Sequence, residues 1–208
     1  MSIYEVESPI DLRNVNDASI WAAEVNRKRP WRYEFFESYV LEIKKLNIKN
    51  PKVLEVGSGP GYLAQVLLEN LSHMSYTAID FSEAMHQLSR EHLGQLAHKA
   101  TYLVADFKDS NWFDVAKQNR FDIVIIHQAL HKLRHKAYAQ QFHMQIKQNL
   151  LVKNGVYIVT DHLVADHGMK NNDLYMTIDE HLKALYSAGF RNIDILKEKN
   201  ALCAFKIT

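Results

Sequence analysis

The residues best suited to bind a ligand are three glycines in one turn, Gly57, Gly59 and Gly61, directly after the apolar run 53–56. Glycine lets the backbone turn sharply and leaves no side chain between the main chain and a ligand. About twenty residues further along, a second apolar run ends in Asp80, where an acidic residue commonly binds both hydroxyls of a ribose. Together these features predict a nucleoside-binding pocket at the carboxyl ends of parallel strands.

Two acidic residues near this turn have competing interpretations. Glu55 lies inside an apolar strand, where an unpaired charge is costly, and this favours a role in the site. Asp80 could instead cap the helix that follows, although Ser82 can already do so.

Pro60 has no backbone N–H, which weakens the turn as a phosphate cradle, and the glycine spacing differs from the dinucleotide-binding fingerprint. The pocket therefore suits a nucleoside without a pyrophosphate.

Histidine side chains are the candidates for a general base in this chain. His127, His131 and His135 recur at intervals of four, which on one helix would indicate a metal site. His127 closes a predicted strand, however, and no nearby cysteine or carboxylate partner is evident, so no metal is expected. His131 and His162 follow strands at the predicted pocket and titrate in a useful range, so either one is a candidate base, a substrate ligand or a surface residue. Four others are expected at the surface: His73, His86, His92 and His98.

The elements that position these residues alternate between strand and helix from residue 52 onward, which indicates an α/β domain. Strands are predicted near 52–57, 75–80, 101–105, 121–126 and 156–161. Ser82 is a predicted N-cap, and Thr177 with Glu180 forms a predicted capping box. The segments 190–197 and 201–207 are separated by only three or four residues, which predicts a hairpin. The expected fold is a doubly wound, mostly parallel seven-stranded sheet with an antiparallel C-terminal hairpin strand.

Residues 1–50 are predicted to form a separate N-terminal helical cap, and residues 51–208 the ligand-binding domain. Arg27, Lys28, Arg29 and Arg32 crowd around Pro30 and Trp31. This segment is either a solvated helix end or a lid in which Arg32 meets a carboxylate and Trp31 meets an apolar face.

Composition narrows the classes of partner. The chain has 25 Lys and Arg against 24 Asp and Glu, so no overall field favours nucleic acid or a membrane surface. Its one cysteine, Cys203, is expected to be a small core residue and is compatible with a reducing cytosol. No signal peptide is evident, and no apolar run approaches the roughly 18 residues of a spanning helix. We therefore expect a soluble cytoplasmic monomer or homodimer.

In combination, the motifs resemble class I S-adenosylmethionine-dependent methyltransferases over residues 50–208, and bacterial small-molecule methyltransferases most of all. The resemblance rests on the segments 55–61, 80–82, 105–107, 121–124 and 151–155. It implies S-adenosylmethionine as cofactor, S-adenosylhomocysteine as product, no metal, and the strand order 3-2-1-4-5-7-6.

The resemblance also implies a role for each matched residue. The methionine part of the cofactor would be lined by Gly57, Ser58 and Gly59 within the turn that Gly61 closes, and oriented by Glu55. Asp80 would bind the ribose. The adenine would be held by Phe81, Met85, Asp106 and Phe107. His127 would lie beside the sulfonium and its methyl group.

The predicted reaction is methyl transfer to an O, N or S nucleophile of a small molecule by in-line displacement. We expect the acceptor between the N-terminal cap and the segments 127–134 and 162–175, in contact with Trp31, Arg32, Gln128 and Tyr175. The aromatic and neutral polar groups here favour a small, flat or heterocyclic acceptor over a highly anionic one. Two alternatives stay open: a non-catalytic cofactor-binding or partner subunit, and a nicotinamide-dependent oxidoreductase, for which the phosphate-binding turn is missing.

Overall fold

The computed structural model describes residues 3–208 and contains one seven-stranded sheet in the order β3-β2-β1-β4-β5-β7-β6. The strands are β1 (Lys52–Val56), β2 (Ser75–Asp80), β3 (Ala100–Val104), β4 (Phe121–His127), β5 (Leu151–His162), β6 (Ile193–Lys199) and β7 (Leu202–Ile207). The first five pair in parallel, whereas β7 is antiparallel to both β5 and β6. The predicted fold class and strand order are confirmed.

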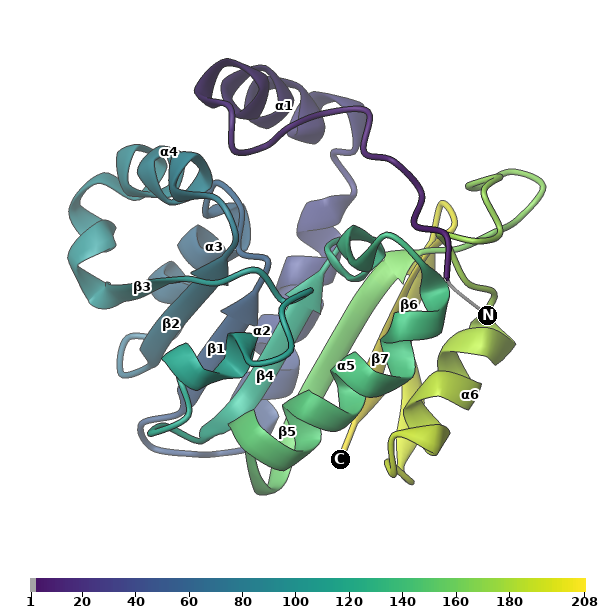
Figure 1. Cartoon of the computed structure of the whole chain (residues 1–208). Helices are drawn as coiled ribbons and strands as arrows, with labels where there is room; N and C mark the ends of the chain where they lie inside the picture. The colour runs from purple at the N-terminus through teal and green to yellow at the C-terminus, as the bar shows by residue number, and fades with distance from the viewer. Residues whose placement is uncertain (1–2) are drawn as a thin grey trace.

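Helices cover both faces of the sheet (Figure 1). One face is covered by α5 (Ala139–Gln145) and α6 (Ile178–Ser187), and the other by α2 (Arg32–Lys45), α3 (Tyr62–Asn70) and α4 (Glu83–Leu93). Successive β4 residues alternate between the two cores, since Ile123 and Ile125 pack with α2 and α3 while Val124 and Ile126 pack with α5. A strand buried on both faces must be apolar along its centre, as this one is from Ile123 to Ile126.

The predicted helix starts are confirmed. The Ser82 hydroxyl accepts a hydrogen bond from the Met85 amide at 3.2 Å and caps α4. Thr177 and Glu180 form a complete capping box at the start of α6. These local bonds fix where each helix leaves the carboxyl edge of the sheet.

The N-terminal region has two parts with different positions. The aromatic residues Phe35, Phe36 and Tyr39 of α2 are fully buried in the core. By contrast, α1 (Val15–Lys28) lies over the carboxyl edge of the sheet and contacts α4 (Figure 1). Residues 3–13, here called the strap, cross the same edge before α1 begins. Within the N-terminal region, only the strap and α1 therefore cover the carboxyl edge of the sheet. The domain boundary at residue 50 remains a prediction.

The largest difference from the sequence-based prediction is the start of β5, and β6 begins at Ile193 and not at residue 190. The helix after β4 ends at Gln145, and a π-helical turn (Ile146–Leu150) leads directly into β5. β5 therefore begins at Leu151, five residues earlier than predicted, and a register irregularity against β4 accommodates the difference. The β6–β7 turn has only two residues, Asn200 and Ala201, and both have positive φ, as a type I′ hairpin turn requires.

One histidine does not lie where it was predicted. His86 is fully buried on the inner side of α4, with its ring 5.1 Å from that of Tyr102, so the prediction of a surface position was wrong. Burial lowers its pKa to about 4, and the ring is neutral. Cys203, in contrast, is buried in β7 as predicted.

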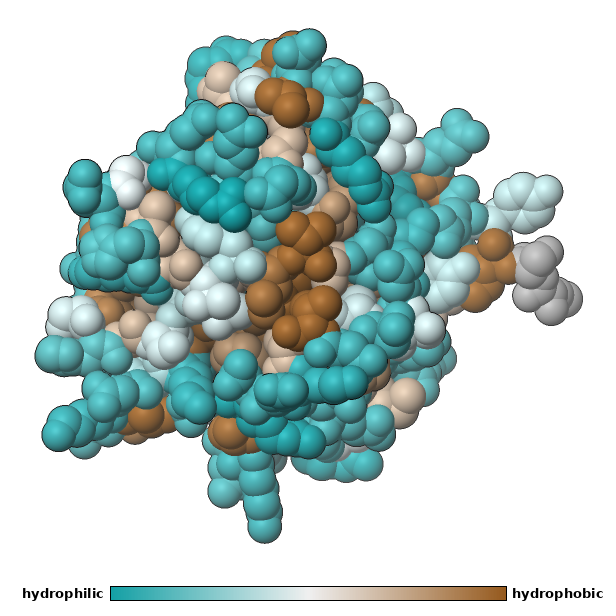
Figure 2. Space-filling model, turned by 60° about the vertical axis from the view of Figure 1, so that its left-hand side comes forward, coloured by the Kyte–Doolittle hydropathy of each residue, from teal (hydrophilic) through white to brown (hydrophobic). Residues whose placement is uncertain are grey.

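On the side where α4 and β3 come forward, Figure 2 shows one hydrophobic patch within a largely hydrophilic face. Among residues 3–208, every helix is too short or too polar to cross a membrane.

Candidate active site

The glycine turn after β1 combines an unusual backbone conformation with close packing at two of its three glycines. All three glycines have positive φ, at 71° for Gly57, 55° for Gly59 and 81° for Gly61, a conformation that other residues rarely adopt. A Cβ atom on Gly57 would lie 2.4 Å from the Ala129 side chain, and one on Gly61 would lie 2.4 Å from the Ser89 hydroxyl. Nothing lies within 4 Å of the equivalent position on Gly59. Gly59 therefore leaves open space beside the backbone.

Asp80 connects the glycine turn to the start of α4. Its Oδ2 accepts a hydrogen bond from the Gly59 amide at 2.8 Å, and its Oδ1 accepts one from the Ser82 amide at 3.0 Å. Burial raises the pKa of the carboxyl group to about 6, although these two amides act in the opposite direction. Each oxygen keeps a second lone pair that a ligand hydroxyl could use.

A cavity at the carboxyl ends of β1, β2 and β4, here called the inner cavity, brings together most of the predicted cofactor-binding residues. Its walls include Glu55, Gly57, Ser58, Gly59, Asp80, Phe81, Met85, Phe107 and His127. Two predicted residues lie beside it. Gly61 caps α3, and Asp106 lines a groove beneath the strap, where it forms an ion pair with Arg13 at 2.7 Å.

The inner cavity contains buried polar atoms that have no partner within residues 3–208. They are the Ser58 hydroxyl, Arg32 Nε, His127 Nε2 and Gln128 Oε1. A buried polar atom without a hydrogen bond is energetically costly, so such atoms mark a place where a polar ligand binds. The residues present therefore fit a cofactor that carries charged and hydroxyl groups.

An acid and a cation line the inner cavity without forming an ion pair with each other. Glu55 accepts a hydrogen bond from the Tyr76 hydroxyl, and burial raises the pKa of Glu55 to about 8. Arg32 donates from Nη1 to Asn26 Oδ1 at 2.9 Å, and burial lowers its pKa to about 10. A bound ammonium group would favour the ionised form of Glu55, and Arg32 can pair with a carboxylate, so this wall suits the two charged groups of an amino acid.

His127 is the last residue of β4 and is held from behind the cavity. Its Nδ1 lies 2.8 Å from the Tyr39 hydroxyl, which also lies 2.6 Å from the Thr160 hydroxyl. Burial, followed by the charge of Arg32, lowers the pKa of His127 well below its ordinary value. The neutral imidazole can face a ligand cation without repelling it. Tyr39 was recognisable in the sequence only as an aromatic residue available for packing.

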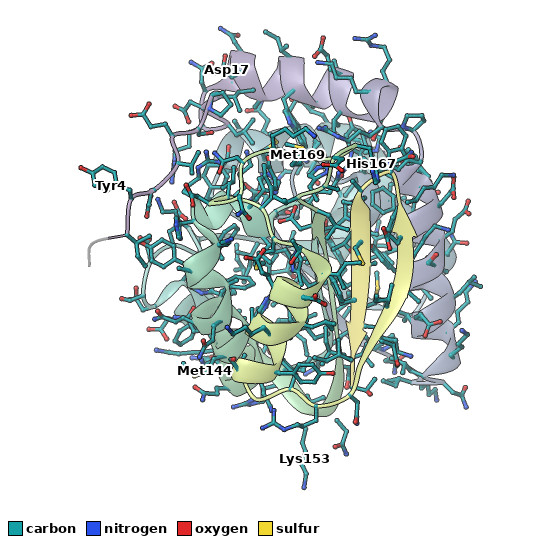
Figure 3. All side chains as sticks on the ribbon, turned by 90° about the vertical axis from the view of Figure 1, so that its right-hand side faces the viewer. Tyr4, Asp17, Met144, Lys153, His167 and Met169 are labelled. Carbon is teal, nitrogen blue, oxygen red and sulfur yellow. The ribbon has the colours of Figure 1, made fainter. Side chains whose placement is uncertain are left out.

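A second cavity of about 500 Å³, here called the outer cavity, lies under the strap and α1. It brings together four predicted residues, Gln128, His131, His162 and Tyr175. Gln128, Trp21 and Lys132 line both cavities and thus lie at their junction. In Figure 3 the segment after β5 that carries His167 and Met169 lies at the same end as Asp17 of α1, and Lys153 at the opposite end.

Two predicted acceptor contacts lie outside the outer cavity. Arg32 lines the inner cavity instead, because it begins α2 and is buried with that helix. Trp31 lines neither cavity and packs against the core formed with α2 and α3. The break between α1 and α2 at Pro30 turns its ring into this core.

The two candidate histidines are distinguished by their partners. Asp161, buried at the end of β5, accepts from His131 Nδ1 at 2.8 Å and from the His131 amide at 2.7 Å. Burial would raise the pKa of Asp161, but the charge and hydrogen bond of His131 bring it below the ordinary value. A carboxylate only accepts, so His131 Nδ1 carries the proton and Nε2 is left as the basic nitrogen.

His162 has a different environment. Its Nε2 lies 2.9 Å from the Gln128 side-chain nitrogen, which can only donate, so this histidine nitrogen accepts. Burial lowers the pKa of His162 to about 4. His131 is therefore better placed to act as a base. Asp161, its partner, could have been recognised from the sequence only as an acid after a strand.

Within residues 3–208, no three His, Cys, Asp or Glu side chains gather into a metal-binding group.

Comparison with known proteins identifies the family. A family model described as a methyltransferase domain matches residues 47–202. The chain is 25% identical over 123 residues to a malonyl-(acyl-carrier protein) O-methyltransferase of Paenibacillus sp. strain JDR-2. This match covers 59% of the chain and 44% of the relative, so the chain spans less than half the length of that protein.

Solved structures share the fold over most of the chain. An S-adenosylmethionine-dependent methyltransferase from Clostridium acetobutylicum matches with a TM-score of 0.70 at 12% identity, covering 91% of this chain and 96% of that one. A complex of DhpI with S-adenosylhomocysteine matches with a TM-score of 0.66 at 16% identity, covering 93% and 94%. Since the family model spans most of the sequence and the predicted motifs form one site, the chain belongs to the class I S-adenosylmethionine-dependent methyltransferases.

Proposed function

We propose that this protein transfers the methyl group of S-adenosylmethionine to a hydroxyl group of a small molecule. The observation that carries the proposal is the hydrogen-bonded pair His131–Asp161, because its histidine lines the outer cavity, which shares part of its wall with the inner cavity. A hydroxyl is a poor nucleophile while it holds its proton, so a base in this position favours oxygen over an amine or a thiolate.

The inner cavity would hold the cofactor. Asp80 would accept hydrogen bonds from the ribose hydroxyls, and Phe81 and Met85 would flank the adenine. Glu55 and Arg32 would bind the ammonium and carboxylate groups of the methionine part. When bound, S-adenosylmethionine supplies a methyl group already activated for displacement by its sulfonium.

The outer cavity would hold and activate the acceptor. Asp161 orients the His131 ring through Nδ1, so that Nε2 can take the hydroxyl proton as the new bond forms. Gln128, at the junction of the cavities, would position the acceptor beside the methyl group. Trp21, Tyr175 and the strap would exclude water, which strengthens these electrostatic contacts.

The named relatives agree with an oxygen acceptor. The Paenibacillus protein is named an O-methyltransferase. A structural match from Planctomyces limnophilus, an O-methyltransferase family 2 protein, was solved in complex with apigenin, which is a small molecule.

The test is a methyl-transfer assay with labelled S-adenosylmethionine against a panel of hydroxylated metabolites. His131→Ala should lower kcat by about 10²–10⁴-fold, and Asp161→Asn should also lower kcat because the ring loses its fixed tautomer. His162→Ala should have a smaller effect. Calorimetry should show unchanged S-adenosylhomocysteine affinity for all three variants.

Two outcomes would contradict the proposal. Cofactor binding without transfer to any class of acceptor would favour a non-catalytic subunit. Full activity of His131→Ala on a hydroxyl acceptor would leave positioning alone as the source of catalysis.

A further inference from the structure

Two cations line the outer cavity without a charged partner. Arg29 follows α1 directly, and Lys132 lies in the short turn after β4; both are half-buried. Within residues 3–208, neither side chain forms an ion pair or hydrogen bond, whereas Lys28 in the same wall pairs with Glu24. Arg134 is also engaged, because it donates to the backbone carbonyls of the strap.

The charges of Arg29 and Lys132 interact with ionisable groups around the proposed base. Burial lowers the pKa of His162 and raises that of Tyr175, and the charge of Arg29 acts to lower both. Burial and then the charge of Arg134 lower the pKa of Lys132, while Asp161 and Asp80 act in the opposite direction. Removing charged groups from water without a counter-ion is costly. An anion in this cavity would offset that cost.

The acidic groups nearby do not supply this anion. Glu24 is already paired with Lys28 and Arg27. Asp161 is buried beneath His131 and accepts its hydrogen bonds. Glu7, on the strap, lines the same cavity but is exposed to solvent. The wall thus keeps an excess of positive charge.

Part of the remaining wall is aromatic, and much of the rest is aliphatic. The His131 and Tyr175 rings lie 5.4 Å apart, and the His162 and Tyr175 rings 6.1 Å apart, with Trp21 at the junction of the cavities. Flat rings of this kind bind planar ligands.

We propose that the methyl acceptor carries an oxyanion, with its hydroxyl at His131 and its anionic group held by Arg29 and Lys132. A flat hydroxy acid has this chemistry. The inference rests on the proposed methyl transfer and adds the charge of the acceptor. It differs from the expectation from the sequence, which disfavoured a highly anionic acceptor, because the sequence did not place Arg29 and Lys132 in this wall.

The test compares matched planar probes by calorimetry, with and without saturating S-adenosylhomocysteine. Benzoate and phenyl phosphate represent two kinds of oxyanion, and benzamide is the neutral control. At least one oxyanion should bind about tenfold or more tightly than benzamide, and added salt should weaken the preference. Arg29→Gln and Lys132→Gln should each reduce the preference by about three- to tenfold.

Arg27→Gln is the matched control. It removes the same charge two residues from Arg29, from an exposed side chain that does not line the cavity, and should leave the preference unchanged. Equal affinities for all three probes, or binding of none at about 10 mM, would overturn the inference. An equal loss in Arg27→Gln would also overturn it, as an effect of overall charge. Failure to bind S-adenosylhomocysteine would count instead against the proposed function.

Discussion

At the scale of single residues, Glu55 couples cofactor binding to a proton. With a pKa of about 8, the free carboxyl group is mostly protonated at pH 7. A bound ammonium group would favour the ionised form, so binding of S-adenosylhomocysteine should release up to about one proton at pH 7. Calorimetry in buffers with different ionisation enthalpies measures this number directly. Glu55→Gln should bind more weakly and release none, and unchanged release in this variant would place the proton elsewhere.

Asp80 has a structural role as well as a binding role. Asp80→Ala should weaken cofactor binding by about 1.5–3 kcal/mol, as expected for a lost hydrogen bond to a charged group. Because the carboxylate also accepts from the Gly59 and Ser82 amides, the same variant should lose about 1–3 kcal/mol of stability. Asp80→Asn keeps one acceptor and should lose less stability in denaturant unfolding. An unchanged affinity in both variants would mean that the ribose is bound elsewhere.

Which residues could be predicted depended on how local their signals are. Gly57, Asp80 and Ser82 follow strands in fixed patterns, so their positions follow from the sequence. Asp161 lies near the end of β5 and His131 in the turn after β4, so their hydrogen bond depends on how β4 and β5 align. Lys132 lacks any motif. Contacts between residues that lie far apart in the chain cannot be predicted from one sequence without the three-dimensional arrangement.

At the scale of elements, the strap is attached to the domain by a small number of polar contacts. Val6 exchanges hydrogen bonds with Arg134, Leu12 accepts one from Ser82, and Arg13 lies 4.6 Å from the Phe81 ring centroid. Segments held by few, solvent-accessible contacts open locally at low cost. A ligand in the inner cavity would add contacts on its inner side.

We therefore expect amide hydrogen exchange in residues 3–32 to slow when S-adenosylhomocysteine binds. Arg13→Ala should speed exchange in the strap several-fold without cofactor, since it removes the ion pair with Asp106. The buried helix α2 is the internal control and should change little in either comparison. If the amides of the strap and α1 exchange equally slowly with and without ligand, these segments form a static cover.

The elements themselves were largely predictable because strand and helix signals are local. Apolar runs and caps located the seven strands and the starts of α4 and α6. The early start of β5 was not predictable, since the pairing of Leu151 with Phe121 across the π-helical turn is a tertiary interaction. Helical periodicity also does not show which side of α4 His86 occupies when polar residues surround it.

At the scale of the whole molecule, buried neutral histidines determine the response to acid. Burial lowers the pKa of His86, His162 and His181 to about 4 and that of His143 to about 3. In the unfolded chain each titrates near 6.5. Their contribution to stability is therefore complete above pH 6.5 and is lost as the pH falls toward 4. Glu55 and Asp80 act in the opposite direction, because their raised pKa values favour the folded state at lower pH.

The histidines outnumber these two acids, so the free energy of unfolding should fall between pH 6.5 and pH 4.5, by about 1.4 kcal/mol per pH unit for each net proton. His181 isolates one contribution, since both ring nitrogens are buried without a partner among residues 3–208 and its ring lies 5.1 Å from that of Phe205. His181→Leu should be more stable at pH 5 and show a shallower pH dependence in urea unfolding. His73→Leu, which removes an exposed histidine, should keep the wild-type slope. If both variants keep the wild-type pH dependence of the free energy of unfolding, the acid sensitivity arises outside the buried histidines.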